Sequence, residues 1–365
     1  TTIPTIELSG KIAQLYHDKD ARVFFVSGGS EAVETAVKMA KKYQMLTGKP
    51  RAYKVISRRG SYHGATAMAV SLGRAAAADP AGPEMVGAVH VANYSFYRPP
   101  FDGRTPEEVA LKCANDFETA IVHQGPETVA AMIAEPVSQM AGIHVPPPVY
   151  WQRLREIADR YNVVLIADEV ITGFGRLGEW FGMMAFGVEP DISAVAKALT
   201  SGYAPLAAAI ATKRIADAFI GGEEQTFRHI ITFGGLPGST AAALANLAIY
   251  EREDLVGNAK RMGEYLAGRL QELYEHPIVG DVRGLGLLQV VELVADRETK
   301  ERFPAEAGLA KRVPALLAER GLHSFRAGDL ISFCPPLCIT KDEVDFMASG
   351  VDAAIGTIER ELGVR

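Results

Sequence analysis

Two charged residues, Asp168 and Lys197, each follow directly after a short apolar run, and together they could support chemistry. Residues 163–167 are apolar and mostly β-branched or aliphatic, and they end at two acids, Asp168 and Glu169. This pattern is typical of a buried parallel strand whose carboxyl end opens into a site. Residues 192–196 form a second such run, which ends at Lys197. Because ligands of open α/β sheets bind at the carboxyl ends of the strands, we expect both side chains at one sheet edge.

Lys197 is the only charged residue between Asp191 and Lys213. One interpretation is a surface lysine whose aliphatic stem covers apolar neighbours, because lysine is rarely buried without a partner. The other is a desolvated lysine, which loses its proton more easily and becomes a nucleophilic amine suited to Schiff-base chemistry. Asp168 on a neighbouring strand is the partner that a pyridinium nitrogen requires. The two residues together suggest pyridoxal phosphate, although neither does so alone.

A glycine-rich turn near the N-terminus could bind the phosphate of such a cofactor. Residues 23–26 predict a strand, Ser27-Gly28-Gly29-Ser30 interrupts it, and a helix follows from Glu31, with Ser30 as the predicted N-cap. Free backbone amides at a helix N-terminus bind anions, most simply a phosphate. Many strand–Gly-Gly–helix turns are only tight connections, and this one lacks the glycine spacing of a dinucleotide site.

Further polar residues follow two other predicted strands. Tyr62 and His63 come shortly after the strand predicted over residues 52–57. The Tyr62 ring could stack on a planar cofactor with His63 as a polar neighbour, or it could pack as an ordinary loop tyrosine. Glu135 ends the run at residues 129–134, which again places an acid at the carboxyl end of a strand.

The composition is that of an ordinary soluble globular protein. The chain has 365 residues, of which 48% are hydrophobic and 22% charged. A net charge of −6 and the lack of a basic run argue against a nucleic-acid surface, and no apolar stretch is long enough to span a membrane. Three scattered cysteines are too few for a disulfide framework or a zinc site, so we expect reduced thiols, no metal and a cytoplasmic location.

Strands and helices alternate over most of the chain, which predicts an α/β fold. Residues 73–106 are rich in Gly, Pro and Ala and predict an excursion with little regular structure. The character changes around residues 277–286, and Thr340 to Glu343 form a capping box before a last amphipathic helix. We expect a large domain over residues 1–262 and a smaller α/β domain over residues 263–365.

Seven motifs in one order resemble those of class III aminotransferases. They are residues 27–36 (SGGSEAVETA), 61–64 (SYHG), 134–136 (AEP), 167–176 (ADEVITGFGR), Lys197, 232–235 (TFGG) and 334–340 (CPPLCIT). The resemblance implies pyridoxal 5′-phosphate and the fold type I architecture, with a mostly parallel seven-stranded sheet in a large domain and a smaller α/β C-terminal domain. It also implies a homodimer with shared active sites, or a tetramer of such dimers.

The resemblance further implies the residues that bind the cofactor: Lys197 covalently, Asp168 at the pyridine nitrogen, Tyr62 and Val170 over the ring faces, Gly29 and Ser30 at the phosphate, Thr232 at the phosphate of the neighbouring subunit, and His63 and Glu135 around them. Lys197 and Asp168 would be the catalytic pair. The sequence departs from the family pattern at two places. Leu236 stands where relatives commonly have histidine, and residues 135–139 (EPVSQ) stand where many relatives have Glu-Pro-x-Gln-Gly, so Gln139 is not assigned the role of that glutamine near the cofactor. Relatives carry a further N-terminal segment before the equivalent of Leu8, which we expect to be absent or disordered here.

Arg326 bears on the substrate. Ser332 occupies the position where several relatives that act on ornithine-like or aminobutyrate-like donors place an arginine, whereas Arg326 is similar to the mobile arginine of amine:pyruvate and ω-amino acid:pyruvate transaminases. There it binds a carboxylate as a two-pronged fork. A surface salt bridge is the alternative for Arg326. The resemblance thus implies ping-pong transfer of an amino group from a primary amine or ω-amino acid to pyruvate or a similar keto acid.

Two other interpretations remain open at this stage. A pyridoxal-phosphate lyase, decarboxylase or aminomutase would share Lys197 and Asp168 and would not need a keto acid acceptor. A non-enzymatic protein with this fold is disfavoured by the intact Lys197, Asp168, Tyr62 and glycine turn. No part of the sequence indicates a nucleic acid, a metal or a membrane as a partner.

Overall fold

The computed structural model describes residues 1–73, 85–324 and 328–364. The chain folds as two compact units: unit 1 comprises Thr1–Gly175 and Glu179–Glu253, and unit 2 comprises Arg176–Gly178 and Asp254–Arg365. The predicted boundary between residues 262 and 263 falls inside helix α8 (Leu255–Gln271), which belongs to unit 2. The assignment of residues 1–262 and 263–365 to two functional domains stays a prediction.

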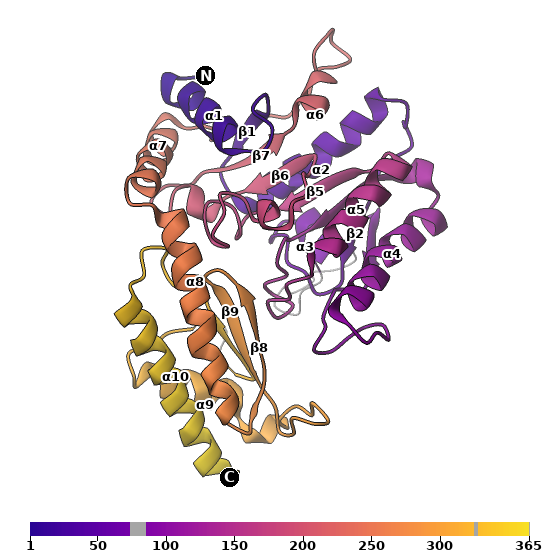
Figure 1. The fold of residues 1–365 in the computed structure, drawn as a ribbon. Helices are drawn as coiled ribbons and strands as arrows, with labels where there is room; N and C mark the ends of the chain where they lie inside the picture. Colours follow the sequence, from indigo (N-terminus) through magenta and orange to yellow (C-terminus); the bar gives the residue numbers. More distant parts are fainter. Residues whose placement is uncertain (74–84, 325–327, 365) are drawn as a thin grey trace. The chain divides into compact units, whose positions relative to one another are not determined.

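Unit 1 alternates strands and helices as expected for an α/β fold (Figure 1). Its helices are α1 (Ile3–Leu15), α2 (Gly29–Leu46), α3 (Ala67–Gly73), α4 (Pro106–Gln124), α5 (Pro148–Tyr161), α6 (Lys213–Asp217) and α7 (Pro237–Arg252). Its strands are β1 (Arg22–Val26), β2 (Lys54–Arg58), β3 (Ala88–Val91), β4 (Val129–Ala134), β5 (Val164–Asp168), β6 (Ile192–Val195) and β7 (Ala207–Ala211). No helix in the described ranges is both long and apolar enough to cross a bilayer.

The strands of unit 1 form one seven-stranded sheet in the order β1-β7-β6-β5-β4-β2-β3. Only β7 runs antiparallel to its neighbours, β1 and β6. The mostly parallel seven-stranded sheet predicted from the sequence is therefore confirmed. Because β4, β5 and β6 are parallel neighbours, the residues that follow them emerge at the same edge. This edge carries Glu135, Asp168 and Lys197.

Both faces of this sheet are covered by helices, which explains why its central strands are apolar throughout. The helix α2 packs against strands β4 to β7, and its Val33, Val37 and Ala40 are completely buried there or nearly so. Alternate strand residues, such as Ile133, contribute to this layer. The helices α4 and α5 pack on each other and on strands β2 to β5. A strand buried on both faces needs no polar side chains until it reaches its end.

The segment over residues 73–106 is more regular than the sequence predicts. It contains β3, which extends the sheet in parallel beside β2. This strand is only four residues long and mostly half-buried at the sheet edge, so it lacks the continuous apolar run that marks β4 and β5. Residues 74–84, in the same segment, lie outside the described residues.

Unit 2 contains a three-stranded antiparallel sheet in the order β10-β9-β8, formed by β8 (Val279–Leu285), β9 (Leu288–Leu293) and β10 (Leu330–Phe333). The helices α8, α9 (Leu309–Ala318) and α10 (Lys341–Leu362) complete it, with α10 in contact with α8 and α9 (Figure 1). The predicted capping box at the start of α10 is confirmed: Thr340 Oγ1 accepts from the Glu343 amide, and the Glu343 carboxylate accepts from the Thr340 amide.

His276 joins the end of the helix η4 (Glu272–Glu275) to α10 through two carboxylates. Its Nδ1 lies 2.8 Å from Glu359 Oε2 and its Nε2 lies 3.0 Å from Asp352 Oδ1. Burial alone would lower the pKa of His276, but the hydrogen bonds to Glu359 and Asp352 outweigh burial and raise it. The Arg297 guanidinium donates to the His276 carbonyl oxygen. The imidazolium form of His276 therefore stabilises the contact with Glu359 and Asp352 of α10.

We expect His276→Asn to reduce the free energy of unfolding by about 1 kcal/mol in mild acid, a value discounted because the Asp352 partner is exposed. Because the folded-state pKa is raised, the stabilisation is complete below the unfolded pKa of about 6.5 and disappears as pH rises through the folded pKa. Urea unfolding from pH 5.5 to 9 measures this dependence. His323→Asn, at an exposed histidine of the same unit, is the control, and a pH-independent difference for His276→Asn would contradict the account.

Candidate active site

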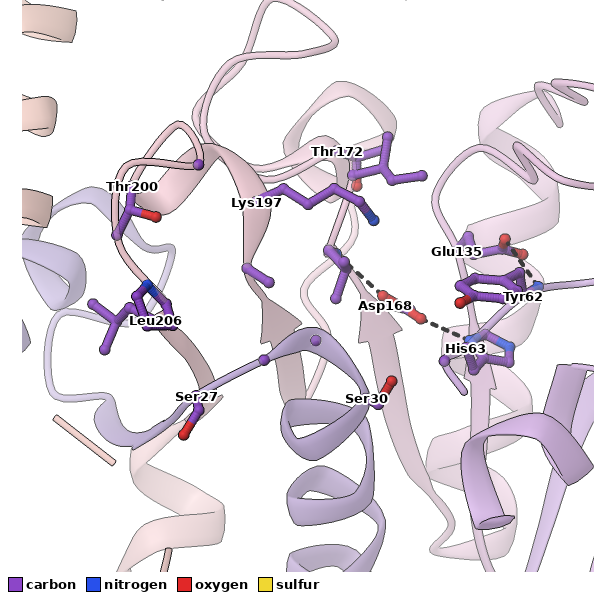
Figure 2. Close-up of a pocket in the computed structure, with 18 of the residues that line it drawn as sticks. Ser27, Ser30, Tyr62, His63, Glu135, Asp168, Thr172, Lys197, Thr200 and Leu206 are labelled. Carbon is purple, nitrogen blue, oxygen red and sulfur yellow. Dashed lines mark hydrogen bonds and ion pairs between the residues drawn. The ribbon is translucent and has the colours of Figure 1, made fainter. Parts of the chain in front are cut away.

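The carboxyl edge of the sheet in unit 1 borders a cavity of about 590 Å³. The turns that follow β1, β2, β4, β5 and β6 all line it, together with the segment that leads into β7 (Figure 2). Cavities of this size hold a cofactor or a drug-sized ligand. The topology thus gathers at one place the turns that the sequence singles out.

Asp168 ends β5 at the floor of this pocket and is 5% exposed. Its Oδ1 accepts from the Val170 amide at 3.1 Å, and its Oδ2 lies 2.7 Å from His63 Nδ1. His63 Nε2 lies 3.1 Å from Ser61 Oγ, which donates its own proton to the Arg58 carbonyl oxygen. His63 Nδ1 donates to the Asp168 carboxylate, and Ser61 lies at the other nitrogen of the ring.

Lys197 follows β6 and begins the short helix η3 (Lys197–Leu199). Asp168 pairs with Ala194 in the sheet register, so the two predicted catalytic residues do emerge from neighbouring strands. The Lys197 side chain points into the pocket that Asp168 and Thr172 also line (Figure 2). Lys197 is exposed to this cavity in the single chain, and the desolvation of its amine stays a prediction. Its apolar sequence neighbours are buried in β6 and the turn, whereas its own side chain projects into the open cavity.

The glycine turn after β1 meets α2 below the pocket (Figure 2). The helix begins at Gly29, and its N-cap is Gly28 rather than the predicted Ser30. Ser30 lies within the first turn, where its Oγ accepts from the Ala65 amide at 3.0 Å. A Cβ at Gly29 would come within 3.1 Å of the Val170 side chain, so this contact favours glycine. With no side-chain cap, the first-turn amides remain available for an anion.

Glu135 lies at the pocket wall and pairs with a completely buried arginine, Arg58. The Arg58 Nη2 donates to Glu135 Oε2 at 3.1 Å and to the Glu135 carbonyl oxygen at 2.7 Å. Ser138 Oγ donates to the same carboxylate, and the Tyr62 amide donates to it at 3.4 Å. Burial raises the pKa of Glu135, while the Arg58 charge opposes the rise. Arg58 thus fixes Glu135, and Glu135 in turn holds the backbone of Tyr62.

We expect Arg58→Met to reduce the free energy of unfolding by about 3 kcal/mol, because Glu135 would remain buried without its cation. The double substitution Arg58→Met and Glu135→Gln should cost clearly less than the sum of the two single changes. Urea unfolding of the four proteins measures this coupling. Arg153→Met, which breaks a more exposed pair with Glu118, is the control and should cost about 1 kcal/mol or less. Equal losses for Arg58→Met and Arg153→Met would contradict this description of the pocket wall.

A family model for class-III aminotransferases matches residues 1–355 of the chain. The chain belongs to the class-III aminotransferase family. The putrescine–pyruvate aminotransferase of Pseudomonas aeruginosa is 38% identical over 94% of this chain and 75% of its own length. The taurine–pyruvate aminotransferase of Bilophila wadsworthia is 36% identical over 99% of this chain and 81% of its own.

Solved structures of ω-transaminases share the fold of this class-III aminotransferase. An (S)-enantioselective ω-transaminase from Thermomicrobium roseum superposes with a TM-score of 0.92 at 40% identity, over 98% of this chain and 80% of its own. An amine transaminase from an uncultivated Pseudomonas species, in its pyridoxal-phosphate-bound form, reaches a TM-score of 0.94 at 39% identity, over 98% and 82% of the two chains. The protein is therefore a pyridoxal-phosphate-dependent aminotransferase.

The pocket of the class-III aminotransferase fits this cofactor. The uncapped N-terminus of α2 suits a phosphate, and Gly29 adds no side chain of its own where its backbone approaches Val170. Asp168 is a buried carboxylate held by two donors, as a protonated ring nitrogen requires, and Lys197 shares its cavity. The donor set and the cavity volume agree with the group that the family uses.

The structure places most of the predicted site residues of this aminotransferase together. Those that line the cavity are Gly29, Ser30, Tyr62, His63, Glu135, Asp168, Val170 and Lys197. Thr232 does not line it but lies on an exposed loop between α6 and α7. Arg326 lies outside the described residues.

Sequence reasoning missed Glu169, which supports the site from the other side of the strand end. Its buried carboxylate accepts from the amides of Gly182 and Met183 at 2.8 and 2.9 Å and from Thr172 Oγ1. Burial raises the pKa of Glu169, and the bonds from Thr172 and the two amides oppose that rise. Glu169 thereby orders the glycine-rich segment after β5. The adjacent acids at the strand end were a signal, since successive residues point to opposite faces.

Proposed function

We propose that the protein transfers an amino group from a primary amine or ω-amino acid to pyruvate or a similar keto acid. The observation that carries the chemistry is the single pocket that Lys197 and Asp168 share at the ends of neighbouring strands. The choice of pyruvate is supported by relatives named for putrescine–pyruvate and taurine–pyruvate transfer. Arg326 is proposed to bind the acceptor carboxylate, on the ground of the sequence alone.

Five of the residues that line the pocket are proposed to hold pyridoxal phosphate. Lys197 would bind it covalently, the amides of Gly29 and Ser30 would bind its phosphate, and Tyr62 and Val170 would cover its ring. Bound pyridoxal phosphate supplies an electron-poor ring that accommodates the negative charge developing at the substrate α-carbon. The proposal for Gly29 and Ser30 is supported by the uncapped start of α2.

Asp168 is proposed to hold the proton at the ring nitrogen of the cofactor, and Lys197 to transfer the proton of the substrate α-carbon. The Asp168 carboxylate, fixed by His63 and the Val170 amide, holds a proton at the ring nitrogen. With the substrate amine held in the pocket, the Lys197 Nζ would accept the proton of the α-carbon and would return it within the same pocket. The donor and the acceptor use one site in turn, so ping-pong kinetics are expected.

Measurement of both products tests this function against the alternatives. The protein loaded with pyridoxal phosphate is incubated with a primary amine or ω-amino acid and pyruvate, and alanine and the carbonyl product are quantified. Formation of the two in equal amounts supports transamination. Consumption of donor without alanine would favour a lyase, decarboxylase or aminomutase, which the names of the relatives do not favour.

A homodimer, or a tetramer of such dimers, with Thr232 acting in the neighbouring subunit, is also proposed. Apolar side chains are highly exposed in the single chain at Tyr203 (89%), Ile230 (92%) and Phe233 (61%), the last beside Thr232. Such exposure is typical of an interaction surface. Sedimentation velocity tests the proposal, and a monomer at micromolar concentration would contradict it. A cytoplasmic location is proposed from the unpaired state of Cys113, Cys334 and Cys338.

A further inference from the structure

The turn that carries Lys197 has an unusual backbone. Lys197 has a φ of 34° and Ser201 a φ of 50°, so the first residue of η3 and the second residue after its end adopt left-handed conformations. Such conformations are unfavourable for residues other than glycine and persist only where the surroundings impose them. The surroundings of this turn therefore determine the direction in which Lys197 leaves the backbone.

Two side chains of α7 hold the turn from outside the pocket. The Asn246 Nδ2 donates to the carbonyl oxygens of Ala198 at 2.9 Å and Leu199 at 3.1 Å. The Tyr250 hydroxyl donates to the Ala198 carbonyl oxygen at 3.4 Å and lies 3.3 Å from Ser201 Oγ.

The geometry of α7 makes this arrangement rigid. Asn246 and Tyr250 are four residues apart and so share one face of the helix. Tyr250 is buried, and its ring stacks on that of Trp180 with centroids 6.3 Å apart. Neither Asn246 nor Tyr250 lines the cavity, so their contacts reach the pocket only through the Lys197 turn.

We propose that Asn246, assisted by Tyr250, is a positioning residue that keeps Lys197 in its left-handed conformation and so aims its amine at the cofactor site. The inference rests on the proposed role of Lys197. Without the amide of Asn246, the Ala198 and Leu199 carbonyl groups lose donors, and the backbone of Lys197 relaxes toward an ordinary conformation. Its amine then leaves the position from which it binds pyridoxal phosphate.

The test is a double-mutant cycle on the dissociation constant of pyridoxal phosphate, measured by equilibrium dialysis. We expect Asn246→Ala to weaken the binding of pyridoxal phosphate about tenfold when Lys197 is present and less than twofold in the Lys197→Ala background. The reason is that the two hydrogen bonds of Asn246 affect the cofactor only through the position of Lys197. Asn246→Asp, which keeps the size and removes the donor, should behave like Asn246→Ala. Tyr250→Phe, which keeps the stacked ring, should weaken binding two- to threefold.

A matched control stands at the opposite edge of the same sheet. Gln44 Nε2 also donates to two carbonyl oxygens, those of Ala130 at 3.1 Å and Asn162 at 2.8 Å. Gln44→Ala should lower stability and leave the dissociation constant unchanged in both backgrounds. Equal weakening by Asn246→Ala in both backgrounds, or none in either, would overturn this inference but not the proposed role of Lys197. If Lys197→Ala itself left the affinity unchanged, the proposed role of Lys197 would fall first and this inference with it.

Discussion

Replacement of Lys197 by alanine should lower turnover with amine and pyruvate by about 10⁴-fold, because the proton of the α-carbon loses its acceptor in the pocket. The same variant should release pyridoxal phosphate on gel filtration, whereas the wild-type protein should retain it. Both expectations follow from the position of Lys197 at the end of β6, in the cavity that Asp168 also lines. Steady-state kinetics and the cofactor content after filtration measure them.

Lys49 provides a matched control for this substitution. Its Nζ donates to the carbonyl oxygens of Val129, Tyr161 and Asn162 at the opposite edge of the sheet, and burial lowers its pKa. Lys49→Ala removes an amine that makes three hydrogen bonds outside the pocket, so it should reduce stability while turnover per folded molecule and cofactor retention stay at wild-type levels. Retained cofactor and turnover in Lys197→Ala would show that another residue does this chemistry.

Asp168→Asn should lower turnover by about 10³-fold, the size expected for the loss of one preorganised charged contact to the reacting system. The substitution keeps the shape of the side chain but removes the carboxylate that His63 Nδ1 meets at 2.7 Å. A neutral amide no longer holds a proton at the ring nitrogen, so the step that removes the α-proton slows. A single-turnover reaction with the amine alone isolates this step.

Asp191→Asn is the corresponding control, since Asp191 is a buried carboxylate at the other edge of the sheet. It accepts from Arg214 at 2.5 Å and from the Leu165 amide at 2.8 Å. Its substitution should reduce stability without changing the single-turnover rate of the folded protein. Similar rates for Asp168→Asn and the wild-type protein would contradict the assignment of Asp168.

The residues at strand ends could be predicted from the sequence because their signal is local. Asp168, Lys197 and Glu135 each terminate an apolar run, and charged residues are rare inside a strand that is buried on both faces. The capping box of α10 is likewise a short-range pattern and is confirmed. Asp168 and Lys197 together already suggest pyridoxal phosphate, and the family motifs add the reaction and the residues around the cofactor.

The supporting residues could not be predicted because their partners are distant in the sequence. Arg58 reads as the end of a strand, and only the sheet order brings it to Glu135. Asn246 lies in an alanine-rich helix, and its partners on the Lys197 turn lie almost fifty residues earlier. The exposure of Lys197 likewise does not follow from its apolar sequence neighbours, because they bury the strand and not the side chain that projects from its end.

The most direct test of the central claim is a visible absorption titration of the protein loaded with pyridoxal phosphate, beside Lys197→Ala. The account predicts a visible cofactor band in the wild-type protein that a primary amine or ω-amino acid bleaches and that pyruvate then restores. The Lys197→Ala protein should not show this cycle. A band that several donors alter and pyruvate never restores would contradict transamination, and an identical band and cycle in Lys197→Ala would contradict the role of Lys197.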